Sequence, residues 1–255
     1  GRMGIPDPSE RAVLFSVLAR EHYRGVVAVH CEKEELLRPD LQDVSDPLSH
    51  SRVRPPSSEI ASVAEQITLA AEAGFAGTLH ICHISTPAAL EVIEGAREHL
   101  PFRITCGATP HHLLLDTDFS GPGELIRVNP PLRSPEARSG LYHALLDGRI
   151  DWIETDHAPH TLEEKQAGVS GIPGFYGYLL LLKQLVRDGI PVSRLRALTY
   201  GNCAEAFGID LPDHDVDFFS AGKLESRAAA VAGEYAADPY RHIEAAGVGV
   251  SGIST

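Results

Sequence analysis

Residues 78–86 read TLHICHIST, and this stretch sets a pattern that the rest of the sequence repeats. TLHIC, residues 78–82, is short and apolar, which is typical of a strand buried in a parallel sheet. An amphipathic segment, residues 58–73, precedes it and stops at Gly74, and His83 follows directly. The order is therefore a helix, a buried strand and a polar side chain at the strand's C-terminal end.

The same unit recurs on both sides of this stretch. VVAVH, residues 26–30, ends on a histidine, RITC covers residues 103–106, and DWIET, residues 151–155, ends directly before Asp156. Helical patterns alternate with these strands at residues 9–23, 58–73, 87–99 and 135–146. This alternation predicts a parallel α/β sheet, open or closed. The four strands should be adjacent in chain order, because right-handed crossovers connect neighbouring strands.

Elsewhere the patterns are less regular. The first helical segment places four aliphatic residues on one face: Val13, Leu14, Val17 and Leu18. Residues 38–57 are polar and contain prolines, which predicts a long loop. After Phe175 we expect two or three helices, one of them at residues 202–207, whereas beyond His214 neither a helical nor a strand pattern is clear.

The composition is that of a soluble globular protein. The chain has 255 residues, of which 43% are hydrophobic, enough for one or two domains. Its formal charge of -13 argues against binding to nucleic acid or an anionic membrane, so a small-molecule substrate or a protein partner is expected. No signal peptide or apolar span is apparent. The four cysteines lack CxxC spacing, which predicts buried thiols in a reducing cytoplasm.

Three side chains have the character of metal ligands. His30, His83 and Asp156 each lie at or just beyond the C-terminal end of a predicted strand. Catalytic groups of (β/α) barrel enzymes collect at this edge, and imidazole and carboxylate together suit zinc. A single strand-end histidine is more often a hydrogen-bonded structural residue, but the agreement of three strands favours a functional role.

The run TDHAPH, residues 155–160, is the most specific signal. An aspartate that ligates a metal also lies close enough to carry a proton from the attacking water to a leaving nitrogen, and His160 can donate to a substrate carboxylate. The alternative is a histidine-rich turn that Pro159 interrupts.

Six motifs in order resemble those of dihydroorotases, which are cyclic amidohydrolases. They are HCE (residues 30–32), HICHIST (80–86), TPHHL (109–113), NPPLR (129–133), TDHAPHTLEEK (155–165) and SGIPG (170–174). Hydantoinases and allantoinases share the histidine and aspartate ligands, but the pairing of NPPLR with DHAPH and GIPG resembles dihydroorotase. The resemblance covers residues 1–208 and implies the C-terminal half of a TIM-type (β/α) barrel, with its last four strands. Residues 209–255 form a tail of uncertain structure, in which DVDFF, residues 215–219, only distantly resembles the family's closing segment.

The resemblance also implies roles for individual residues. His30 and His83 correspond to the metal-ligating histidines of the fifth and sixth barrel strands, and Asp156 to the ligand and proton shuttle of the eighth. Four residues match positions that hold the substrate ring and its carboxylate: Asn129, His160, Pro173 and Gly174. Three further histidines are expected to be structural or to orient a ligand: His80, His111 and His112.

Part of the family's site is missing. Its two-zinc centre also needs an HxH pair on the first strand and a bridging lysine or aspartate on the fourth, and no HxH occurs before His30. The opening GRMGIPDPSER resembles the segment that follows the fourth strand. The implied activity is reversible hydrolysis of dihydroorotate to carbamoyl aspartate in pyrimidine biosynthesis, and this chain alone is expected to be inactive.

Two alternatives stay open. One is a non-catalytic, dihydroorotase-like scaffold subunit, associated with itself or with an aspartate transcarbamoylase-like partner, because an open half barrel leaves strand edges unpaired. The other is a hydantoinase- or allantoinase-type hydrolase that acts on a different cyclic amide.

Overall fold

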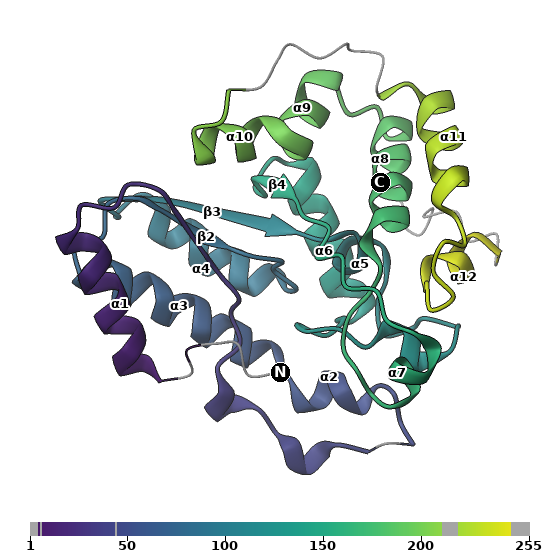
Figure 1. Cartoon of the computed structure of the whole chain (residues 1–255), viewed down its shortest axis with the longest axis horizontal. Coiled ribbons are helices and arrows are strands. Elements are labelled where there is room, and N and C mark those ends of the chain that lie inside the picture. Colours follow the sequence, from purple (N-terminus) through teal and green to yellow (C-terminus); the bar gives the residue numbers. More distant parts are fainter. Residues whose placement is uncertain (1–4, 6, 44, 211–218, 246–255) are drawn as a thin grey trace.

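A four-stranded parallel sheet in the order β1-β2-β3-β4 forms the centre of the computed structural model (Figure 1), which describes residues 5, 7–43, 45–210 and 219–245. Its strands are β1 (Val26–Val29), β2 (Thr78–Ile81), β3 (Arg103–Ala108) and β4 (Trp152–Ile153). All three neighbouring pairs are parallel. The prediction of four parallel strands, adjacent in chain order, is confirmed.

Helices connect the strands and extend the chain beyond them. They are α1 (Pro8–Arg20), α2 (Ser49–Val53), α3 (Pro56–Glu72), α4 (Pro87–Arg97), α5 (Pro110–Leu114), α6 (Pro135–Leu146), α7 (Leu162–Gln166), α8 (Gly174–Arg187), α9 (Val192–Arg196), α10 (Asn202–Phe207), α11 (Ala221–Val231) and α12 (Tyr240–Ala245). Short 3-10 turns are η1 (Glu34–Leu36), η2 (Pro39–Leu41) and η3 (Gly123–Ile126), and η4 (Ala197–Gly201) is one π-helical turn. The predicted loop at residues 38–57 therefore contains α2 and η2.

Proline defines where many of these helices start. Each of α1, α3, α4, α5 and α6 has a proline as its first residue, where the missing N–H costs no hydrogen bond and the fixed φ suits a helix. The side chains of Asp7, Thr109, Ser134 and Thr161 cap α1, α5, α6 and α7. Start signals in the sequence thus explain why the helix starts were well predicted.

The buried face of α1 differs from the predicted one. Phe15 is 1% exposed and packs edge-on against Phe75, with ring centroids 5.7 Å apart. Of the four predicted residues, Val13, Leu14 and Val17 are 62%, 38% and 37% exposed, and only Leu18 is partly buried against the core. The helix itself forms as predicted, but an aromatic ring makes its main core contact because a large ring buries more apolar surface than valine.

Strand register sorts the side chains onto two faces. His80 pairs with Thr105, and Gly107 pairs with Trp152. Because side chains two residues apart share a face, Glu154 lies on that same face. Leu79, Ile81, Ile104 and Ile153 lie on the opposite face, in the core that α3 and α4 cover. Polar side chains therefore collect on one face of the sheet and apolar ones on the other.

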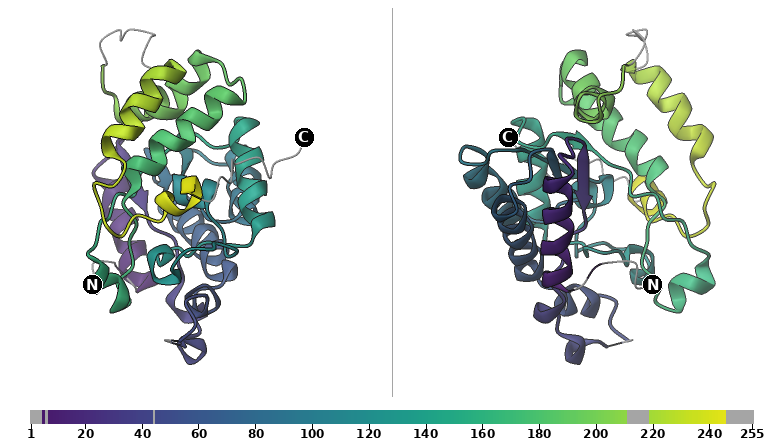
Figure 2. Two further views of the ribbon diagram at one scale, coloured as in Figure 1. Left: turned by 90° about the vertical axis from the view of Figure 1, so that its right-hand side faces the viewer. Right: turned by 60° about the vertical axis from the view of Figure 1, so that its left-hand side comes forward.

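The C-terminal helices pack on the rest of the protein. Helix α11 lies along α8 (Figure 2), and the Tyr240 ring occupies the space where a side chain at Gly177 would lie. Leu224 and Ala228 of α11 are buried. Helices α11 and α12 lie in the part of the tail where the residue pattern predicts neither helix nor strand, and residues 215–218 of DVDFF lie outside the described residues.

None of the described helices is long and apolar enough to cross a membrane. The four cysteines are free thiols, of which Cys31 and Cys106 are buried and Cys82 and Cys203 are partly buried.

Replacing Phe15 with alanine should lower the free energy of unfolding by about 3–5 kcal/mol, because a buried ring is removed and a cavity is left. Val13→Ala, on the exposed side of the same helix, should change it by less than about 0.5 kcal/mol. Urea denaturation of the two variants measures both values. Equal losses would mean that the helix buries the valine face after all.

Candidate metal centre and substrate loops

His30 and His83 lie at the C-terminal ends of the neighbouring strands β1 and β2, and their rings face each other. The Nδ1 atom of His30 is 3.2 Å from the Nε2 atom of His83, and the ring centroids are 4.9 Å apart. Two nitrogens that bind one tetrahedral zinc at 2.0–2.1 Å lie about 3.3 Å from each other. The spacing of this histidine pair therefore fits a shared metal ion.

The state of His83 also fits a metal ligand. Burial lowers the pKa of His83 to about 4, and the nearby His30 contributes to the same effect. The ring is thus neutral at pH 7, which is the form that binds metals. Its Nδ1 atom is buried and has no hydrogen-bond partner within the described residues.

A buried carboxylate fixes the other side of His30. The Nε2 atom of His30 is 3.1 Å from Glu32 Oε2, and Arg54 donates to the same carboxylate from Nη2 at 2.7 Å. Burial alone would raise the pKa of Glu32, but the hydrogen bonds from His30 and Arg54 lower it to about 2. Such a carboxylate partner orients a metal-binding imidazole.

Asp156 follows β4 and completes the predicted ligand set. Partial burial raises the pKa of its carboxyl to about 6; the charge of Glu154 adds to this effect and His30 opposes it. Asp156 and His83 have φ values of 41° and 35°, a left-handed conformation that is costly for residues other than glycine and that clusters at functional sites. A carboxyl that titrates near neutral pH can both accept and release a proton.

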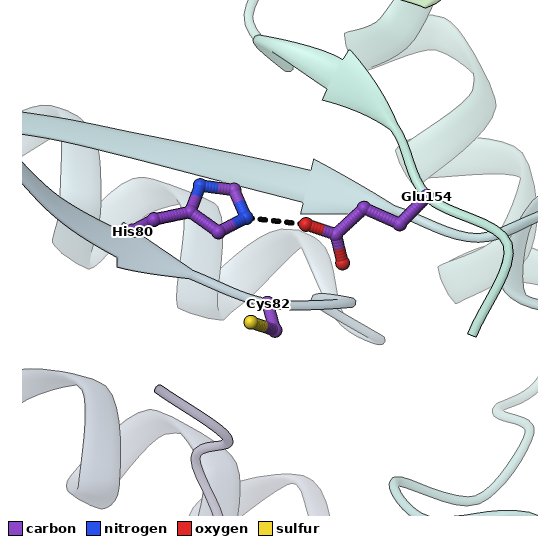
Figure 3. Close-up of side chains that lie close together, drawn as sticks. All are labelled: His80, Cys82 and Glu154. Carbon is purple, nitrogen blue, oxygen red and sulfur yellow. Dashed lines mark hydrogen bonds and ion pairs between the residues drawn. The ribbon is translucent and has the colours of Figure 1, made fainter. Parts of the chain in front are cut away.

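The sequence interpretation did not single out Glu154, although this residue links three elements. Its carboxylate contacts the Nε2 atom of His80 directly, accepts from the backbone N–H of His83 at 2.8 Å, and accepts from Trp152 Nε1 at 3.2 Å. Figure 3 shows the His80 ring and the Glu154 carboxylate pointing at each other, with Cys82 beside them. The signal for Glu154 was a charged residue at the end of an apolar strand.

His80, Cys82 and Glu154 also have the donor atoms of a metal site, all within 4.8 Å of one another. Yet His80 and Glu154 are in direct contact, so no ion fits between them as they stand. The Nδ1 atom of His80 is 2.9 Å from Thr105 Oγ1, and its ring stacks on Trp152 with centroids 4.1 Å apart. This group is therefore a hydrogen-bonded cluster beneath the histidine pair.

The TDHAPH and SGIPG loops are joined to each other. His157 forms a parallel bridge with Ile172, and its Nδ1 atom accepts from the backbone N–H of Gly174 at 3.0 Å. Pro173 precedes α8 as its N-cap residue. A side chain at Gly174 would overlap the Thr155 carbonyl, so only glycine allows this close approach.

The remaining predicted site residues lie on two other loops. Asn129 accepts through Oδ1 from His50 Nε2 at 2.8 Å. His160 Nδ1 is 3.3 Å from Glu164 Oε2, and the His160 ring lies against Gly171. Their partners His50 and Glu164 belong to α2 and α7 and are not predicted site residues. His30 and His83, in contrast, contact each other directly.

The TPHHL histidines differ from each other. His112 is buried between Thr109 Oγ1 at 2.8 Å and the Pro130 carbonyl at 3.0 Å. His111 is fully buried, and neither of its ring nitrogens has a hydrogen-bond partner within the described residues. Burial holds the pKa of His111 well below its usual value, so this ring is neutral.

Glu32→Gln should lower the free energy of unfolding by about 3–5 kcal/mol at pH 7, because Arg54 loses its buried partner. The folded-state pKa of Glu32 is depressed from 4.5 to about 2, so its stabilisation is present above pH 4.5 and is lost as the pH falls towards 2. Urea titrations of wild type and variant should therefore converge over that range. Glu94→Gln, in the more exposed pair with Arg149, is the control and should cost about 1 kcal/mol or less. A difference that is constant with pH would contradict the proposed pairing.

Comparisons with known proteins support a common origin for much of the chain. It is 42% identical over 192 residues to the dihydroorotase of Methanothermobacter thermautotrophicus, which covers 72% of this chain and 42% of the relative. It is 36% identical over 217 residues to the dihydroorotase of Methanosarcina mazei, which covers 79% of this chain and 45% of the relative. The chain thus spans less than half the length of these curated relatives. No family model matches the sequence.

Solved structures agree on the fold. A D-hydantoinase (dihydropyrimidinase) from Thermus sp. superposes with a TM-score of 0.71 at 26% identity, over 80% of this chain and 47% of that one. A dihydroorotase from Saccharomyces cerevisiae superposes with a TM-score of 0.63 at 17% identity, over 81% and 56%. The sheet and its helices therefore form part of a TIM-type (β/α) barrel. By sequence the chain is a homologue of the dihydroorotases over much of its length, and its fold is shared with solved cyclic amidohydrolases.

Proposed function

We propose that this chain supplies part of the active site of a metal-dependent cyclic amide hydrolase, most specifically one that interconverts dihydroorotate and N-carbamoyl-aspartate. The observation that carries the proposal is the convergence of His30 and His83, 3.2 Å apart, at the same sheet edge as Asp156. The identity of 36–42% to dihydroorotases supports this substrate over other cyclic amides. The activity is that of a soluble enzyme of pyrimidine biosynthesis, and we expect it in the cytoplasm.

In this proposal His30, His83 and Asp156 hold a divalent metal, for which zinc is the best candidate. When bound, such an ion polarises the amide carbonyl and makes a water molecule more acidic. The neutral ring of His83 can bind without losing a proton, and the contact with Glu32 orients the ring of His30.

Asp156 is proposed to move the proton. During hydrolysis water adds to the ring carbonyl and gives a proton to the Asp156 carboxylate, and the C–N bond then breaks as that proton passes to the departing nitrogen. Ring closure follows the same steps in reverse. The Asp156 carboxylate follows β4 at the sheet edge that carries His30 and His83, so it lies on the side of the sheet where water and the ring nitrogen would meet it.

The joined TDHAPH and SGIPG loops, together with Asn129, are proposed to hold the substrate. His160 is assigned as a donor to the substrate carboxylate, and the backbone at Pro173 and Gly174 as the wall of the ring site. The bridge between His157 and Ile172 supports this assignment, because it fixes the two loops relative to each other.

A second candidate is hydrolysis of a hydantoin or dihydropyrimidine ring. The similarity to the Thermus sp. hydantoinase favours it, although at 26% identity this likeness is weaker than that to dihydroorotases. Turnover of dihydroorotate, hydantoin and dihydrouracil by a full-length protein that contains this chain would distinguish the two, and turnover of none of them would favour the scaffold role.

The purified 255-residue chain should retain well under one equivalent of zinc after dialysis. A catalytic zinc ion takes three protein ligands and a water, but the three proposed here are only part of the larger two-zinc ligand set that the resemblance implies, so we expect them to hold the ion weakly. Metal analysis of the chain and of His83→Ala, which should hold still less, measures this. Two tightly bound ions per chain would mean that the ligand set is assigned wrongly.

In a full-length protein, Asp156→Asn should lower kcat by about 10²- to 10⁴-fold, because an amide cannot accept the proton of the attacking water. His160→Ala should act mainly on KM, since a hydrogen bond to a charged group contributes about 1.5–3 kcal/mol to binding. Steady-state assays in both directions separate the two effects. The 255-residue chain by itself should show no turnover, and measurable activity there would overturn the account of the site.

A further inference from the structure

Glu154 is a buried charge for which the proposed function has no role. It lies on the polar face of the sheet, and its side chain is 18% exposed. Burial alone would raise the pKa of Glu154, but its hydrogen bond to His80 brings the value below normal, so the carboxylate is charged. A buried charge is costly unless it is bonded, and the groups that bond to Glu154 belong to β2, to β4 and to His83, two residues beyond β2.

The neighbouring strand provides the space for this carboxylate. Gly107 of β3 lies beside β4, and a Cβ atom at this position would overlap the Glu154 carboxylate. His80 is itself held in place by Thr105 and by stacking on Trp152. Residues of β2, β3 and β4 thus fix the position of the Glu154 carboxylate. This carboxylate in turn accepts a hydrogen bond from the backbone of His83, just beyond β2.

The bond from the His83 N–H to Glu154 Oε2 is the link to the proposed metal centre. It is 2.8 Å long and is made by the backbone of a residue whose φ is 35°. A strained backbone persists only where its surroundings hold it. The direction of the His83 ring towards His30 depends on that backbone conformation.

We propose that Glu154 is a positioning residue, which holds the backbone of His83 so that its imidazole faces His30. This inference rests on the proposed role of His83 as a metal ligand. The role of Gly107 follows from it, because any larger residue there would push the carboxylate away from His83.

The test compares Glu154→Gln and Gly107→Ala with the control Glu94→Gln in the metal-free 255-residue chain. Glu154→Gln keeps the shape of the side chain but has one acceptor oxygen in place of the two that His80, His83 and Trp152 contact in the wild type. Gly107→Ala leaves Glu154 unchanged in sequence and displaces its carboxylate by adding a methyl group on β3. Both should shift the His83 amide proton upfield in NMR spectra and weaken the nuclear Overhauser contacts between the His30 and His83 rings. Glu94→Gln should leave both signals unchanged.

Zinc affinity, measured by calorimetry with Zn²⁺ as the probe, gives a second readout. It should fall about 10- to 100-fold in both test variants, as expected when a group that orients a ligand is lost. A variant with a lower melting temperature but unchanged His30–His83 contacts and zinc affinity would reduce Glu154 to a structural role and overturn the proposal. A large loss of zinc affinity in Cys82→Ser would also overturn it, because the cluster would then bind the metal itself.

The outcome does not depend on catalysis. If the His83 signals change in Glu154→Gln and Gly107→Ala but Asp156→Asn turns over normally, the proposed function is refuted and positioning by Glu154 stands. Unchanged His83 signals combined with loss of turnover in Asp156→Asn would refute the positioning role alone.

Discussion

In a parallel sheet, residues paired across strands share a face, and every second residue along each strand returns to it. The register that pairs His80 with Thr105 and Gly107 with Trp152 therefore also determines where Glu154 lies. A shift by one residue in any strand would exchange these polar groups for the apolar side chains that α3 and α4 cover. The hydrophobic face of the sheet thus selects the register, and the register assembles the polar cluster under His83.

Three carboxylates lie close to the histidine pair, and their surroundings give them different protonation behaviour. Glu32 is bonded to His30 and Arg54, and Glu154 to His80, so both have a pKa below its usual value despite burial. Asp156 has no hydrogen-bonded cationic partner within the described residues, and burial together with the charge of Glu154 raises its pKa to about 6. The paired carboxylates are thus suited to orienting histidines, and the third to transferring a proton.

The parts of this arrangement that depend on local sequence could be predicted. Short apolar strands that end at His30 and before His83 and Asp156 follow from residue type alone, and proline start signals located the helices. The buried face of α1 was missed because the contact between Phe15 and Phe75 joins distant segments. Glu154 was missed for a similar reason, since its importance depends on the space at Gly107, which only the pairing of β3 with β4 creates.

Strands β1 and β2 differ in how exposed they are to solvent, and this difference bears on the proposed metal centre. All four residues of β2 are buried, and His83 is 8% exposed, whereas β1 pairs on one side only within the described residues and the His30 side chain is 45% exposed. An open groove of about 720 Å³ runs along β1 and α1, lined by apolar residues such as Leu14 and Val29 and by charged ones such as Lys33 and Arg54. The unpaired edge of a strand favours pairing with a further strand. Any strand that paired there in parallel would bring the residues at its own C-terminal end beside His30, and so beside the proposed metal ligands.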